Sequence, residues 1–213
     1  MHGNELRKAN RTAAAIARLT HALDMSVDLE GRAVALAFLA RATGDTGDPL
    51  IFDQTLTAYR RVLDYTAGTG TLTNPFTFRE IQLRGLLATG RTPDAVRIIA
   101  AGRPGDEVPI APQWRVIERV TTGEVLVAAG DLDNAEQTLR TALTAAEAGR
   151  LPHQVQRAVR AAQNARALGA VVLEGRPLST ASQQRFQTAA KSVRQLVVSS
   201  VLKATHRQSP VGT

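Results

Sequence analysis

The sequence predicts an all-α fold, and its hydrophobic pattern and composition both support this class. Apolar residues recur at three- and four-residue steps, the spacing that places side chains on one face of a helix. Aromatic residues make up only 4% of a chain that is 44% hydrophobic, so the aromatic and β-branched runs typical of sheets are absent. The expected core consists of alanine, leucine and valine, which allow helices to pack closely.

The clearest expected element is a helical hairpin over residues 123–147. Gly130 can adopt the left-handed conformation that ends a helix, and the carboxylate of Asp131 can accept a hydrogen bond from the free N–H groups that begin the next one. The chain is therefore expected to reverse at these two residues. Small residues lie where the two helices must approach, and larger apolar residues recur on the facing sides; the small ones are Gly123, Ala135 and Ala142, and the larger ones Val120, Val127, Leu139 and Leu143.

Part of this hairpin repeats an earlier segment at a distance of forty residues. The segment Gly90–Ala95 has the same glycine, acidic residue and alanine in register as Gly130–Ala135. A looser copy precedes both, with Tyr59 at the position of Ile99 and Leu139. Self-similarity at a fixed period is typical of a solenoid, in which each helix pair buries its apolar face against its neighbours.

The repeated residues resemble the tetratricopeptide repeat. The third copy matches the family's small positions with Gly123, Ala135 and Ala142 and its large apolar positions with Leu126 and Leu139, and the second copy keeps Leu86, Ala95 and Ile99. The period of forty differs from the family's period of about 34, and the usual aromatic and proline positions are not matched. Over residues 30–150 the resemblance implies a short right-handed solenoid of antiparallel helix pairs with a concave groove. Armadillo-like or HEAT-like pairs are the alternative.

The resemblance also implies what the groove binds and which residues line it. In that family the groove binds a protein or peptide, and the first helix of each pair faces it. The segment from Leu139 to Arg160 further resembles the repeat half, or sensor half, of actinobacterial regulators, which implies a regulatory adaptor or a stand-alone sensor half. The groove candidates are Thr77, Glu80, Arg84, Ile117, Val120 and Glu124.

Residues 1–25 are expected to form an N-terminal capping helix, from Asn4 to Met25. Its arginines lie in a narrow sector opposite the apolar face, which suits either contact with water or a nucleic-acid or membrane-surface role. The apolar face consists of Leu6, Ala9, Ala13, Ile16, Leu19 and Leu23, and the arginines are Arg7, Arg11 and Arg18.

Turn formers bound the helices of the repeat region, residues 26–150. Asn74-Pro75 and Thr92-Pro93 each begin a helix, because proline in the first turn lacks only an N–H group that would be unpaired anyway. The glycine-threonine run at 67–71 is expected to be a linker, since a phosphate loop needs a strand before it and a lysine or further glycines at set spacing. The expected helices cover residues 31–43, 52–66, 74–89 and 92–101, and the third pair covers 113–148.

Residues 151–213 are expected to form basic C-terminal helices in the same continuous stack, over 153–173 and 179–205. This region has nine Lys and Arg residues against the single acid Glu174, whereas residues 24–150 have thirteen basic and seventeen acidic residues. Such asymmetry favours an anionic partner, or a homodimer in which the basic end of one copy meets the acidic middle of another.

One face of the helix from His153 suits nucleic acid chemically. Arginine pairs phosphate oxygens, and asparagine or glutamine can contact base edges. This stripe contains no acid, but an outer face in contact with water is the alternative explanation. The candidates are His153, Arg157, Arg160 and Asn164, extended by Lys191 and Arg194 on the next helix.

No pattern in the sequence predicts catalysis, a metal or another cofactor. There is no cysteine, and no pair among the four scattered histidines has the helical spacing of a zinc site. No stretch approaches the about 20 apolar residues that span a membrane, and the N-terminal residues lack the apolar stretch of a signal peptide, so we expect a cytoplasmic protein with no membrane partner. The predicted function is a non-catalytic protein-interaction module; nucleic-acid-binding regulation and an all-α enzyme with a hidden site are the alternatives.

Overall fold

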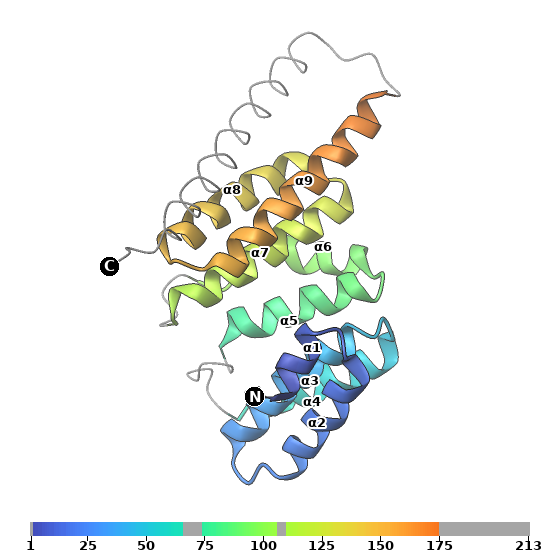
Figure 1. Cartoon of the computed structure of the whole chain (residues 1–213), viewed down its shortest axis with the longest axis vertical. Helices are drawn as coiled ribbons and strands as arrows, with labels where there is room; N and C mark the ends of the chain where they lie inside the picture. The colour runs from blue at the N-terminus through green and yellow to red at the C-terminus, as the bar shows by residue number, and fades with distance from the viewer. Residues whose placement is uncertain (1, 66–73, 106–109, 175–213) are drawn as a thin grey trace, which may run out of the picture. The chain divides into compact units, whose positions relative to one another are not determined.

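The computed structural model describes residues 2–65, 74–105 and 110–174 (Figure 1). Over these ranges the chain forms nine α-helices and no strand, so the all-α prediction is confirmed. The chain divides into two compact units, residues 1–165 and residues 166–213, and the first contains most of the described residues. None of the helices described is long and apolar enough to cross a membrane.

The helices are α1 (His2–Lys8), α2 (Thr12–Asp24), α3 (Leu29–Gly44), α4 (Pro49–Leu63), α5 (Pro75–Ala88), α6 (Thr92–Ala100), α7 (Pro112–Ala129), α8 (Leu132–Ala148) and α9 (Pro152–Glu174). Those from α3 onward begin and end close to the predicted limits. The predicted helix over 179–205 lies outside the described residues.

Polar side chains and prolines begin helices where the sequence predicted. The side chain of Asn74 accepts a hydrogen bond from the backbone N–H of Thr77 at 2.8 Å, and Pro75 is the first residue of α5. This arrangement satisfies one of the N–H groups that every helix start leaves free. At the turn between α7 and α8, Gly130 has a φ of 78° and the carboxylate of Asp131 caps the start of α8. The predicted hairpin turn is confirmed.

The predicted helix from Asn4 to Met25 is wrong in one respect, because it is two helices. Asn10 separates them with a φ of 57°, a left-handed conformation that asparagine tolerates better than most residues. The backbone N–H of Arg11 then donates to the carbonyl of Leu6 at 2.9 Å and closes the end of α1. Arg7 does not simply face water either, since it forms an ion pair with Asp45, which follows α3, at 2.8 Å.

Within the first unit, each helix from α1 to α7 packs against the next one, α3 also packs against α5, and α5 packs against α7 (Figure 1). Four apolar clusters fill these contacts. They lie between α1, α2 and α3, between α3, α4 and α5, between α4, α5, α6 and α7, and between α7, α8 and α9 up to Ala165. The core therefore runs from helix to helix in chain order.

Two glycines allow the closest approaches between helices. A Cβ at Gly123 of α7 would lie 2.5 Å from a methyl carbon of Leu139 in α8, and a Cβ at Gly85 of α5 would lie 2.0 Å from the ring of Phe52 in α4. Both distances are far below van der Waals contact. The first confirms the prediction that a small residue at position 123 lets the hairpin helices pack closely.

Candidate functional site

The odd-numbered helices α3, α5 and α7 join one another through buried ion pairs as well as apolar contacts. In the Glu80 cluster (Arg41, Glu80 and Arg84), both Nε and Nη2 of Arg41 on α3 donate to one carboxylate oxygen of Glu80 on α5, at 3.1 and 2.7 Å. Nε of Arg84 donates to the other oxygen at 2.8 Å. Glu80 and Arg41 are both buried. One carboxylate thus ties α3 to α5.

Glu80 is ionised in spite of its burial. Burial by itself would raise the pKa of this carboxyl group, because a charge is poorly solvated in the interior. The positive charges of Arg41 and Arg84 outweigh that effect and hold the pKa of Glu80 well below its ordinary value. Removing one partner of such a group leaves an uncompensated buried charge, which is strongly destabilising.

A second set of polar contacts links α7 to α9. Arg157 of α9 donates twice to the carboxylate of Glu124 on α7, through Nε at 3.1 Å and Nη2 at 2.6 Å. Its Nη2 also donates to the hydroxyl oxygen of Thr121 at 3.0 Å, and this hydroxyl lies 3.4 Å from a carboxylate oxygen of Glu80. A chain of polar contacts therefore crosses α3, α5, α7 and α9.

The Glu118 cluster (Arg79, Arg103, Glu118 and Thr122) lies between α5, α7 and the segment that follows α6. The fully buried Glu118 accepts from Nε of Arg79 at 2.9 Å, from Nε of Arg103 at 3.0 Å and from the hydroxyl of Thr122 at 2.9 Å. Arg79 also donates through Nη1 to the carbonyl of Ile98, in the last turn of α6, at 2.7 Å. This cluster joins α5, α6 and α7.

Three of the six predicted groove residues lie in the interior. Thr77, Glu80 and Val120 are buried, so they do not line a surface as the sequence suggested. These residues are buried because α5 and α7 pack against each other, and the neighbouring helices cover the remaining faces of both. The three that keep some exposure are Arg84, Ile117 and Glu124.

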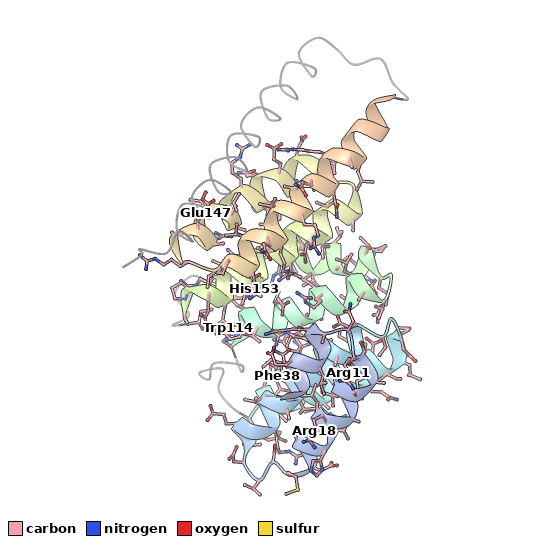
Figure 2. All side chains as sticks on the ribbon, in the orientation of Figure 1. Arg11, Arg18, Phe38, Trp114, Glu147 and His153 are labelled. Atoms are coloured by element: carbon pink, nitrogen blue, oxygen red, sulfur yellow. The ribbon has the colours of Figure 1, made fainter. Side chains whose placement is uncertain are left out.

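The predicted nucleic-acid stripe on α9 is only partly an exposed cationic face. His153, labelled in Figure 2, is exposed, as are Arg160 and Asn164. Arg157 is instead half-buried against Glu124, an acid of α7 that the sequence of α9 does not reveal. Lys191 and Arg194 lie outside the described residues.

The sequence carried one signal for the buried charges that sequence reasoning missed. Arg41 and Glu80 are 39 residues apart, and so are Arg79 and Glu118. This spacing is close to the forty-residue period, so oppositely charged residues recur at nearly equivalent positions of successive odd-numbered helices. A search for charge pairs at the repeat period would have found both.

Over the ranges that the structure describes, no group of three or more acidic and histidine side chains could hold a metal ion. The carboxylates of Glu80 and Glu118 are buried and already bound by arginine. The arrangement can fix helices in register and present half-exposed charged groups at its edge. No protein-family model, curated protein or solved structure matches the chain.

Proposed function

We propose that α3 to α8 and the part of α9 up to Ala165 form a short helical-repeat stack of the tetratricopeptide-like type, and that the chain is a non-catalytic module that binds a protein or peptide as a regulatory adaptor. One observation carries the proposal: α3 packs on α5 and α5 on α7, each time with an arginine–glutamate pair spaced 39 residues apart. Repeated contacts between alternate helices are what a stack of helix pairs requires.

The proposed binding surface is the half-exposed edge of α5, α7 and α9, formed by Arg84, Ile117, Glu124 and Arg157. The charged side chains keep 26%, 27% and 24% exposure at Arg84, Glu124 and Arg157 respectively. Each is already held by an ion pair, Arg84 by Glu80 and Arg157 by Glu124. Side chains fixed before binding lose less conformational entropy when a partner arrives, so this edge suits recognition.

The test is affinity capture with the whole chain as bait, followed by binding measurements on each captured protein. The variant Arg84→Ala with Glu124→Ala removes two charged groups of opposite sign from the proposed surface. Its matched control is Glu136→Ala with Arg140→Ala, an exposed glutamate–arginine pair on α8. Unfolding curves for both variants separate loss of binding from loss of structure.

We expect a partner that the control variant retains and the surface variant loses. A partner retained equally by both would reject the surface. Turnover of a small molecule in an unbiased metabolite assay, if abolished by substitution in this chain, would reject the non-catalytic module itself.

A further inference from the structure

The Glu118 cluster contains buried hydrogen-bond donors that no part of the described structure satisfies. Arg79 uses Nε for Glu118 and Nη1 for the carbonyl of Ile98, and Arg103 uses Nε for Glu118. The Nη2 atoms of both arginines are buried and have no hydrogen-bond partner. Such donors are rare in folded proteins, because each costs free energy unless an acceptor, a water or an ion reaches it.

The same cluster carries unbalanced charge. The guanidinium groups of Arg79 and Arg103 face the single carboxylate of Glu118, so two positive charges meet one negative charge. The guanidinium carbon of Arg115 also lies near the ring of Phe76, at 5.5 Å from its centre, and this residue has further interactions of its own. Thr122 and the carbonyl of Ile98 supply dipoles but no charge. One monovalent anion would neutralise the excess of these two arginines over Glu118 and could accept from a free Nη2 group.

We propose that Arg79 and Arg103 form a binding subsite for a monovalent carboxylate. A carboxylate presents two acceptor oxygens to planar guanidinium groups and carries the single charge that the site lacks. A divalent oxyanion would reverse the charge of a buried site and suits it less. The subsite lies between α5 and α7, and it does not depend on the partner-binding surface proposed above.

The two arginines of this subsite differ in exposure, and a ring contact supports the more exposed one. The side chain of Arg79 is 8% exposed and that of Arg103 is 28% exposed, although the Nη2 atoms of both are buried. The guanidinium carbon of Arg103 lies 5.4 Å from the centre of the buried ring of Phe76. This cation–π contact helps to hold the donor group in place without using its free N–H.

The experiment titrates sodium acetate into the whole chain at constant ionic strength, with sodium fluoride as the salt that acetate replaces. The readouts are the NMR signals of the Arg79 and Arg103 side-chain Nε–H groups and of the indole N–H of Trp114. Trp114 is the only tryptophan, and it lies one helical turn before Glu118 on α7. Sodium sulfate at the same ionic strength tests the preference for a single charge.

The critical variant is Arg103→Gln, and its matched control is Arg97→Gln, which removes an exposed arginine from α6. Arg103→Lys keeps the charge but loses the planar donor group. Asp106 and Glu107 follow Arg103 in the sequence and lie outside the described residues. The titration is therefore repeated with Asp106→Asn and Glu107→Gln, so that an acid of the chain itself cannot mask the subsite.

We expect saturable shifts with acetate in the wild-type chain, in the variant with Asp106→Asn and Glu107→Gln, or in both. Arg103→Gln should raise the dissociation constant about tenfold or more, and Arg97→Gln should leave it unchanged. Arg103→Lys should bind more weakly than the wild type. Absence of saturable shifts in both backgrounds would overturn the proposal and assign the free donors to water. Equal effects of Arg103→Gln and Arg97→Gln, or tighter binding of sulfate than of acetate, would overturn it as well.

Discussion

The ring of Phe52 on α4 fills the space that any side chain at Gly85 on α5 would need, with Cζ 2.0 Å from the position of a Cβ. Phe52 is fully buried, so its ring cannot move aside without disturbing the core. We expect Gly85→Ala to lower the free energy of unfolding by about 2 kcal/mol, because overpacking outweighs the higher helix propensity of alanine. Urea denaturation monitored by circular dichroism measures this.

Gly123→Ala is the companion substitution for that experiment. Its Cβ would approach a methyl carbon of Leu139 at 2.5 Å, and a leucine can change rotamer where a packed ring cannot. The expected loss is therefore smaller than for Gly85→Ala. A Gly85→Ala variant as stable as the wild type would contradict the close packing of Phe52 on α5.

Glu80→Gln is expected to destabilise the fold by about 3–5 kcal/mol, the range for breaking a buried ion pair by removing one partner. Glutamine keeps the shape of the side chain but leaves Arg41 and Arg84 without a counter-charge. Glu136→Gln on α8 is the control, since an exposed substitution changes stability by no more than about 0.5 kcal/mol. Similar losses for both variants in urea would show that the Glu80 cluster contributes little.

The Glu80 cluster also predicts a specific acid sensitivity. Because the pKa of Glu80 is lower in the folded state than in the unfolded chain, its contribution is present above the unfolded pKa of about 4.3 and is lost as pH falls through the folded pKa. The wild type should therefore lose stability more steeply than Glu80→Gln as the pH is lowered from 5 to about 2. Parallel stability curves for the two proteins over that range would contradict the assignment.

Any binding of DNA by α9 should depend on Arg160 and not on Arg157. Arg157 is engaged by Glu124, so Arg157→Gln is expected to lower the free energy of unfolding by about 1.5 kcal/mol and to leave DNA affinity unchanged. Arg160→Gln should lower DNA affinity and leave the free energy of unfolding unchanged. Titrations with duplex and single-stranded DNA at two salt concentrations measure both, since phosphate contacts weaken steeply with salt. Equal losses of affinity would show that Arg157 exchanges its partner for phosphate.

The helices and their turns were predictable because their local signals are strong and agree with one another. Gly130 and Asp131 specify a turn, and Asn74 and Pro75 specify a helix start. The structure has the turn and the helix start at these predicted positions. Asn10 was the weaker signal: it neither breaks a helix like proline nor ends one as reliably as glycine. The single helix predicted across it was therefore two.

The candidate site was harder to predict, because charged residues usually face water. The resemblance to the tetratricopeptide repeat placed Glu80 in a groove, whereas the structure buries it between Arg41 and Arg84. The partners are distant in sequence, so neither helix alone reveals the pairing. The prediction that Arg157 lies on an open face failed for the same reason, because its partner Glu124 belongs to α7.

Arg79 and Glu80 are adjacent in α5, and they point their opposite charges at different neighbours, Glu118 of α7 and Arg41 of α3. If α5 slipped by one residue, Glu80 would take the place of Arg79 against Glu118, or Arg79 would take the place of Glu80 against Arg41. Either slip replaces a buried attraction by a buried repulsion of like charges. The order of two consecutive residues thus selects one rotation of α5 about its own axis, and the close approach of Gly85 to Phe52 favours the same rotation.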